Sequence, residues 1–593
     1  MKDFLKYTFA TVVGIVIFCI ICTIFMLMSM VGIIASQGQT TNIKDNSILV
    51  INLKGEIADH DTPSSEIEVL LGDNAQTLGL DNLTAAIKKA KNNDNIKGIY
   101  IESGDVSGSP ATLSALRNAL KDFRKSKKFI VTYADQYSQG AYYVCSVADK
   151  VWMNPKGMLS WHGLAAQPQY MRDFLNKVGV KMQVVKVGQY KSATEQYTED
   201  HMSDANREQT TAYITGIWQT MLKDVSESRK ISTDSLNAYA DAVMEFTSTE
   251  DLKKKKLIDA TMYADEVKVE MKKLLKIDAD DEINQIGLTT IGNVKSNEED
   301  GDDQIAVYYC EGNIVQSPVQ SIIMGNGGIV GPDVCKDLEA LAKDDDVKAV
   351  VIRINSGGGD AYASEQMWHQ IKELKKVKPV VVSMGGMAAS GGYYMSCAAN
   401  WIVAEPTTLT GSIGIFGTFP DASALMTDKL GFKYDEVKTN KHSSMSLVAQ
   451  ARPFSEDEIA LLQKYINSGY SLFRQRVAEG RGMKVDEVEK IAQGHVWLGK
   501  DAIAIKLVDQ LGSIDDAIAM AAKLAKTNSY YTSSYPGEMD WAEKFLNKSK
   551  GGNYLDEQLR LTLGEYYQPF VILRSIREQS PIQARMDFEF RIN

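Results

Sequence analysis

Residues 378–406 read KPVVVSMGGMAASGGYYMSCAANWIVAEP, and residues 127–155 read KKFIVTYADQYSQGAYYVCSVADKVWMNP. Both stretches begin with an apolar run, continue through small residues to a Tyr-Tyr pair, and end in a second apolar run. This pattern is typical of a buried strand, a turn into a helix, and another strand. The chain therefore contains one structural unit twice, and such a repeat decides the fold.

The similarity continues on both sides of these stretches, at an offset of about 250 residues. Strands alternate with helices in each half, which predicts an α/β fold whose strands are mostly parallel. The matched segments are 47–57 with 304–314, 83–101 with 338–354, 178–192 with 430–444, and 253–267 with 503–518.

The two halves meet at an acidic run, 295–304, which lacks apolar periodicity and therefore indicates a solvated linker. In the second half a helix is predicted to open at Ser455, because Ser455 and Glu458 have the spacing of a capping box. No element is predicted after about residue 527. The predicted parts are an N-terminal segment, a first α/β repeat, a linker, a second repeat and a C-terminal extension: 1–40, 41–296, 297–304, 305–527 and 528–593.

The N-terminal segment has the composition of a membrane anchor. Residues 7–35 carry no charge, and about 20 apolar residues suffice to cross a bilayer as a helix. Lys2 and Lys6 precede them, so the positive-inside rule predicts a single-pass inner-membrane protein with a cytoplasmic N-terminus and an extracytoplasmic, periplasmic body. A cleaved signal peptide is the alternative, but its apolar core is shorter and ends at an A-x-A-like site.

Composition limits the possible partners. The formal charge is −11 and the pI is about 5.3, so no basic face is expected to attract nucleic acid. The six cysteines include no CxxC pair, and no Cys/His cluster has zinc spacing. Neither a metal site nor a cofactor is expected.

Ser390 lies where the apolar run of 379–383 and the small residues after it give way to a helix predicted from about Gly391. Helix N-termini carry unpaired N–H groups and a positive dipole end, which suit an oxyanion developing beside an attacking serine. The run RINSGGGD, 353–360, can add further N–H groups as an anion-binding nest. It is not a phosphate loop, because no Gly-Lys-Ser/Thr follows. Taken alone, Ser390 is equally a tightly packed helix start.

The duplication provides an internal comparison for this serine. Ser390 aligns with Gln139 in the first half, whereas Lys191 of the first half aligns with Ser443 in the second. Each half keeps what the other lacks, which is expected if one catalytic pair forms across the two halves. A lone lysine is usually exposed, but one buried between the halves could be neutral and accept the Ser390 proton.

Several motifs together resemble signal peptide peptidase A, also called protease IV, in the long duplicated form of this family of Ser–Lys peptidases. The motifs are SMGGMAASGGYYMS at 383–396, TLTGSIGIFG at 408–417 and AQGHVW at 492–497, and the resemblance extends from the anchor to about residue 525.

The resemblance implies a role for each site residue. Ser390 would be the nucleophile, Lys191 the general base, and Ser412 the serine that hydrogen-bonds the lysine. The oxyanion hole would be formed by Gly358, Gly359 and Gly391. One residue departs from the family turn, because Gly357 stands where Pro is usual, and this leaves open which glycine donates.

The resemblance also implies a fold, an assembly and substrates. The fold would be two tandem Clp protease/crotonase-like α/β domains after the transmembrane helix. The protein would be a homo-oligomer, a dome-shaped tetramer, that degrades cleaved signal peptides and other apolar peptides. Whether Ser390 meets Lys191 of its own chain or of a neighbour stays open.

Three alternatives remain. His442 lies one position before the counterpart of Lys191, so a Ser–His peptidase of the same fold is possible. A non-catalytic membrane scaffold is a second possibility, because fold alone never proves activity. An acyl-CoA enzyme of the crotonase type is disfavoured, since the expected compartment lacks coenzyme A.

Overall fold

A computed structural model describes residues 43–60, 77–294, 301–317, 328–445, 451–537, 580–586 and 591–592, together with scattered positions between 6 and 21. The predicted anchor at 7–35 therefore lies mostly outside the described residues. Within the described ranges, no helix has the length and apolar character needed to cross a bilayer.

The first half is built on a parallel sheet whose strands follow the order β2-β1-β3-β4-β5-β7, with β8 also paired to β1. The strands are β1 Ser47–Ala58, β2 Thr77–Gly79, β3 Ile96–Ser107, β4 Phe129–Tyr137, β5 Lys150–Leu159, β7 Ala260–Thr261 and β8 Asn284–Ile286.

The second half repeats this plan in the order β18-β16-β14-β12-β9-β20, with β15 between β14 and β19. Among the pairs of this sheet, β16 with β18 is antiparallel. Strand β9 starts within the predicted linker. The strands are β9 Asp303–Glu311, β12 Val347–Ser356, β14 Val380–Ala389, β15 Trp401–Ala404, β16 Leu409–Gly411, β18 Val496–Leu498, β19 Gln510–Leu511 and β20 Tyr530–Tyr535.

Helices occur at equivalent places in the two halves. The first half has α3 Leu80–Asn92, α4 Pro110–Phe123, α5 Gln139–Cys145, α8 Asp204–Arg229 and α11 Ala264–Leu275. Their counterparts are α13 Gly331–Lys343, α14 Ala361–Leu374, α15 Gly391–Ser396, α16 Glu456–Arg481 and α19 Ile514–Ala525. The predicted capping box of α16 is present, because Ser455 N donates to Glu458.

Matching hydrogen bonds confirm the alignment of the repeats in space. Tyr142 Oη donates to the carbonyl of Leu257, and Tyr393 Oη donates to that of Leu507, both at 2.9 Å. Because the two tyrosines are equivalent, Gln139 and Ser390, three residues before each of them, are equivalent too. Two ion pairs with a buried arginine repeat in the same way: Arg229 with Asp259, and Arg481 with Asp509.

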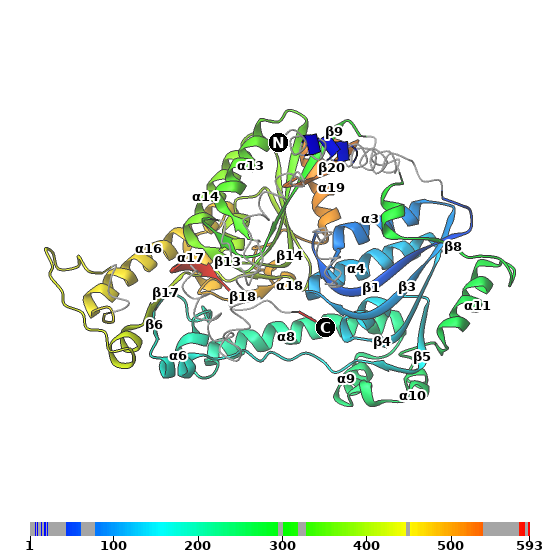
Figure 1. The fold of residues 1–593 in the computed structure, drawn as a ribbon, viewed down its shortest axis with the longest axis horizontal. Helices are drawn as coiled ribbons and strands as arrows, with labels where there is room; N and C mark the ends of the chain where they lie inside the picture. The colour runs from blue at the N-terminus through cyan, green and yellow to red at the C-terminus, as the bar shows by residue number, and fades with distance from the viewer. Residues whose placement is uncertain are drawn as a thin grey trace.

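A third sheet joins pieces from the whole chain, in the order β11-β10-β13-β21-β17-β6. Figure 1 shows β6, in cyan, beside β17 and near α16 of the second half, so the sequence boundary between the halves is not the boundary in space. The strands are β6 Lys181–Lys186, β10 Ile314–Val315, β11 Ile329–Val330, β13 Gly358–Asp360, β17 Phe416–Asp421 and β21 Ile582–Arg585.

Two expectations differ from this architecture. Strands β20 and β21 lie in the extension after residue 527, where no element was predicted, because pairing with distant strands stabilises them. Conversely, residues 430–440, the sequence match of β6, form no strand and are exposed, and Figure 1 shows this yellow segment projecting from the body. In the first half the same pattern is held by its pairing with β17.

The halves also share their hydrophobic core. The largest cluster of buried apolar side chains belongs mainly to the first half but includes Met387, Ala389, Leu409 and Val496 of the second. Val185 of β6 is buried in the core of the second half in turn. Burial of apolar surface therefore holds the halves together as one body.

Candidate functional site

Ser390 occupies the junction between β14 and α15, as the residue that precedes the helix. Its backbone adopts φ +53° and ψ −112°, a conformation that non-glycine residues rarely populate. Two main-chain hydrogen bonds hold it there: Ser390 N donates to the carbonyl of Gly411 at 2.8 Å, and Tyr394 N donates to the Ser390 carbonyl at 2.7 Å. Such strain persists only where the surroundings impose it, and it is concentrated at functional sites.

Lys191 follows β6 and is brought to Ser390 by the pairing of β6 with β17. Its side chain is 1% exposed. The Nζ atom lies 2.7 Å from Ser390 Oγ, 2.9 Å from Ser412 Oγ and 3.1 Å from the Ser412 carbonyl oxygen. Each of these three partners is a neutral oxygen atom. The structure thus brings together, within one chain, two residues that are 199 positions apart.

The loop that carries Lys191 is held from both halves. Gln209 of α8 donates to the carbonyl of Tyr190 at 3.0 Å and to Ser192 Oγ at 3.2 Å, and its Oε1 accepts from Val496 N at 3.2 Å. A Cβ at Gly494, where φ is +78°, would lie 2.6 Å from Lys191 N, so only glycine permits this approach. Sequence reasoning missed Gln209, since a glutamine within a long helix carries no signal of its own.

Ser412 is the second serine with a strained backbone, at φ +49°. Its N–H donates to the carbonyl of His495 at 2.7 Å. The His495 ring packs between Tyr190 and Trp497, at centroid distances of 4.4 and 4.1 Å. Burial lowers the pKa of His495, so this histidine is neutral and serves as packing beneath the lysine loop.

The glycine turn, residues 357–359, lies beside the N-terminus of α15. Gly358 has φ +99°, and a Cβ there would lie within 3.0 Å of both Gly391 N and the Ala584 carbonyl oxygen. Its own N–H donates to Ser356 Oγ at 3.1 Å. Gly359 approaches β10 instead, where a Cβ would collide with the Ile314 carbonyl. Gly358 and Gly391 therefore lie side by side near the Ala584 carbonyl oxygen, and Gly359 packs against β10.

The chain's own C-terminal strand fills the gap between the glycine turn and β17. Strand β21 runs antiparallel to both neighbours, with Gln583 opposite Asp360 on one side and Phe416 on the other. Met586 N donates to the Gly357 carbonyl at 2.8 Å, and Ala584 is fully buried. The site thus accommodates an extended backbone directly beside Ser390, which no pattern in the sequence indicated.

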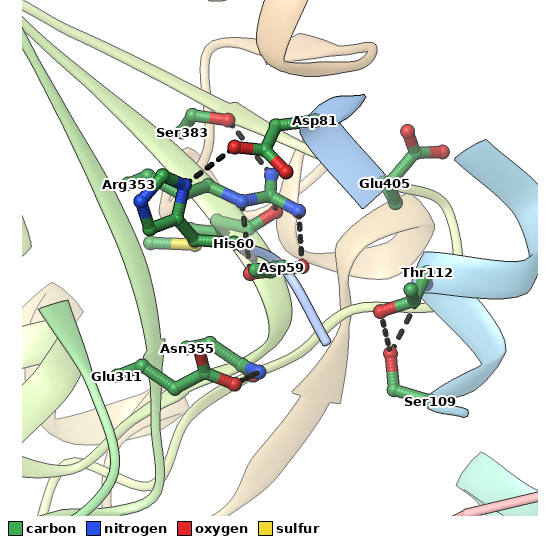
Figure 2. A network of polar contacts seen from close by, with 12 residues as sticks. Asp59, His60, Asp81, Ser109, Thr112, Glu311, Arg353, Asn355, Ser383 and Glu405 are labelled. Atoms are coloured by element: carbon green, nitrogen blue, oxygen red, sulfur yellow. Dashed lines mark hydrogen bonds and ion pairs between the residues drawn. The ribbon is translucent and has the colours of Figure 1, made fainter. Parts of the chain in front are cut away.

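A buried ion pair connects the first half to the strand that ends in the glycine turn. Figure 2 shows Arg353 of β12 donating to both carboxylate oxygens of Asp59, each at 3.0 Å. Arg353 also donates to Ser383 Oγ at 2.9 Å, and both charged side chains are at most 3% exposed. Glu405 lies near this pair, and burial raises the pKa of its carboxyl to about 8, although Arg353 acts in the opposite direction.

Two glycines in the SMGGM motif allow this close approach. A Cβ at Gly385 would lie within 3.0 Å of Asp59 Oδ2, and one at Gly386 would lie 2.5 Å from Ser109 Oγ. Ser109 caps α4, where Thr112 N donates to its hydroxyl, as Figure 2 shows. The motif therefore serves contact between the halves as well as the strand before Ser390.

The repeat counterparts of the two central residues lie elsewhere. Gln139 is buried, and its carboxamide bonds His162 N, Gly163 N and the Gly163 carbonyl, each at 3.0 Å. Ser443 is exposed and donates to Asn440 of its own loop. His442 faces Glu458, with Nδ1 4.0 Å from Oε1.

This arrangement has the parts needed for acyl transfer. The hydroxyl of Ser390, whose backbone is strained, contacts the buried amine of Lys191. This amine can take the hydroxyl proton if it is unprotonated. Backbone N–H groups lie at the start of α15 and in the glycine turn, and preorganised donors of this kind can stabilise an oxyanion. An adjacent strand position accepts extended polypeptide.

Comparisons with known proteins agree with this geometry. Peptidase family S49 matches residues 122–278 and again 372–528, and the Clp protease family matches 322–404. Protease 4 from Salmonella typhi is 34% identical over 545 residues, covering 89% of this chain and 87% of the relative. The chloroplastic serine protease SPPA of Arabidopsis thaliana is 33% identical, covering 82% and 70%. Protease 4 from Haemophilus influenzae is 31% identical, covering 84% and 83%.

Proposed function

The chain belongs to peptidase family S49 and is a serine endopeptidase, and from that premise we propose that Ser390 is its nucleophile and Lys191 its general base. The observation that carries this proposal is the 2.7 Å contact between Lys191 Nζ and Ser390 Oγ in a buried setting. The contacts of Nζ with both oxygen atoms of Ser412 support a role for Ser412 in orienting the amine.

In the first step Ser390 Oγ bonds to the carbonyl carbon of the substrate while its proton passes to Lys191 Nζ. The carbon–nitrogen bond then breaks, and the same proton moves to the leaving amine. In the second step Lys191 takes a proton from water, the resulting hydroxide attacks the acyl ester, and the proton returns to Ser390. This cycle requires an unprotonated lysine, and burial of an amine disfavours its charged form.

The N–H groups of Gly358 and Gly391 are the oxyanion donors in this proposal, and the Gly358 N–H exchanges its contact with Ser356 Oγ for the oxyanion. The carbonyl oxygen of Ala584 lies next to both glycines, which supports them over Gly359. Preorganised donors of this kind are worth about 10²–10³ in kcat.

The substrates we propose are extended apolar peptides, among them cleaved signal peptides. The groove occupied by β21, between β13 and β17, supports binding of substrate as an added strand. The uncharged segment at 7–35 supports a membrane anchor, with a periplasmic body near such peptides. A homo-oligomer, by resemblance a tetramer, completes the proposal, and light scattering of the detergent-solubilised protein tests it.

A serine-directed fluorophosphonate probe tests the catalytic assignment. It is expected to label the wild type and not Ser390→Ala, while Lys191→Ala loses both labelling and peptide cleavage. Ser443→Ala and His442→Ala serve as controls that retain both. Loss of activity in His442→Ala, with full activity in Lys191→Ala, would make this a Ser–His enzyme. Absence of labelling in the wild type would favour the non-catalytic scaffold.

A further inference from the structure

The C-terminal residues contact the first half as well as the groove between β13 and β17. Gly108 N donates to the Ile592 carbonyl at 3.3 Å, and Ile592 N donates to the Gly108 carbonyl at 3.0 Å. Ile592 is 2% exposed and belongs to the large core cluster. Arg591 forms an ion pair with Glu56 at the end of β1.

Gly108 stands where the first half would have its own glycine turn. It follows β3 and directly precedes Ser109, the cap of α4, just as Gly359 directly precedes Asp360, the cap of α14. In both halves, then, the last residues of the chain pair with the backbone at the same place in the fold.

Helices α5 and α15, which follow the next strand in each half, show the same correspondence. A Cβ at Gly140, the counterpart of Gly391, would lie 3.3 Å from the Ile592 carbonyl oxygen. A Cβ at Gly391 would lie 3.0 Å from the Ala584 carbonyl oxygen. The same C-terminal segment therefore presents one carbonyl to each of two equivalent glycines.

The first half keeps this backbone geometry without the chemistry. Gln139 stands in the place of Ser390, and its carboxamide bonds the backbone of His162 and Gly163. A place that binds a backbone strand but has no nucleophile can hold polypeptide without cutting it.

We propose that Gly108 and Gly140 form a second, non-catalytic site for extended polypeptide, which holds the part of a substrate that follows the bond cleaved at Ser390. This inference rests on the proposed function, because that function identifies Ser390 as the residue that cleaves the bond. Residues 582–586 and 591–592 are the internal occupants of the two places. Ala584 lies at Gly391, and Ile592 follows it by eight residues at Gly140.

The contacts define the class of ligand. Hydrogen bonds to Gly108 involve only main-chain atoms, so they select an extended backbone rather than a sequence. The buried side chain of Ile592 adds a preference for an apolar residue in eighth place after the cleaved bond. The two sites adjoin, because Ser109 packs against Gly386 of β14.

Peptides of graded length test this site in the full-length protein. Quenched fluorescent peptides share one sequence up to the cleaved bond and carry leaving segments of four to twelve residues. For the wild type, kcat/KM is expected to rise about fivefold or more once an apolar residue occupies eighth place. In Gly108→Pro, which lacks the donor N–H, the ratio between long and short peptides falls to about one. In the control Gly287→Ala, whose new Cβ meets no atom within 4 Å, the ratio is retained.

A second variant keeps the test decisive if Gly108→Pro fails to fold. Ile592→Asp places a charge where the native side chain is buried, and so expels the internal occupant. It is expected to raise kcat/KM for long peptides more than for short ones. Equal rates at all lengths, or an unchanged ratio in both variants, would overturn the proposal.

Photo-crosslinking separates this inference from the proposed function. Ser390→Ala is mixed with a peptide that carries benzoylphenylalanine in eighth place after the bond. The adduct is expected within residues 107–113 or 139–144. The same group placed second after the bond is expected to crosslink to the second half instead. Adducts confined to the second half would contradict the second site, and failure of the wild type to cleave any peptide would contradict the function alone.

Discussion

Ser412 contacts Lys191 through both of its oxygen atoms, which lie 2.9 and 3.1 Å from Lys191 Nζ. Ser412→Ala removes the hydroxyl contact and leaves the carbonyl contact. A hydrogen bond of this kind is worth about 1–3 kcal/mol, so kcat should fall about 10- to 100-fold with little change in KM. Steady-state cleavage of a quenched peptide measures this. Ser443→Ala, at an exposed serine, should keep the wild-type kcat, and full activity in Ser412→Ala would remove its orienting role.

Glu405 makes stability depend on pH. Burial raises the pKa of its carboxyl from 4.5 to about 8, so the folded protein holds a proton that the unfolded chain has lost. The stability from this group is fully present below about pH 4.5 and is lost as pH rises to about 8. At about 1.4 kcal/mol per pH unit, the loss amounts to a few kcal/mol.

Glu405→Gln stays neutral at every pH and should therefore flatten this dependence. Urea unfolding midpoints at pH 5 and pH 8 should differ less in Glu405→Gln than in the wild type. Glu282→Gln, at an exposed loop position, should leave the difference unchanged. An equal slope in Glu405→Gln would show that the carboxyl is ionised in the folded protein.

At the scale of elements, Gly385 of β14 sets how closely the first half approaches. In Gly385→Ala the new Cβ would collide with Asp59 Oδ2 and displace the carboxylate from Arg353. Overpacking of this kind costs about 1–3 kcal/mol, so the urea midpoint should fall and the peptidase rate should fall with it. Gly287→Ala introduces a Cβ into open space and should change the midpoint very little. A midpoint equal to that of the wild type in Gly385→Ala would show that the halves can move apart freely.

The elements that the sequence predicted are those with a local pattern. Apolar runs and small residues predicted β4, β14 and the helices after them, and the duplication drew attention to Ser390 and Lys191. Strand β21 escaped notice because Ile582–Arg585 is short and mixed, and its stability comes from strands on either side. Asp59 and Gln209 escaped for the same reason, since each acts on a part of the chain hundreds of residues away.

At the scale of the whole molecule, the two residues of the proposed dyad meet within one chain. Lys191 Nζ contacts Ser390 Oγ of the same polypeptide at 2.7 Å. A chain that lacks one of these residues therefore cannot receive it from a neighbouring chain. Co-expressed Ser390→Ala and Lys191→Ala chains, purified as mixed oligomers through two affinity tags, should therefore stay inactive. Mixed oligomers of wild type and Ser390→Ala should retain activity. Recovered cleavage in the doubly defective mixture would mean that neighbouring chains complete each other's site.

The separation of 199 positions between Lys191 and Ser390 also sets an order of events during biosynthesis. A ribosome adds about 5–20 residues per second, so Lys191 is made roughly 10–40 s before Ser390. Strand β17, which pairs with β6, follows later still. A nascent chain therefore holds Lys191 long before Ser390 is there to contact it. A first half made on its own therefore cannot form this contact, however completely it has folded.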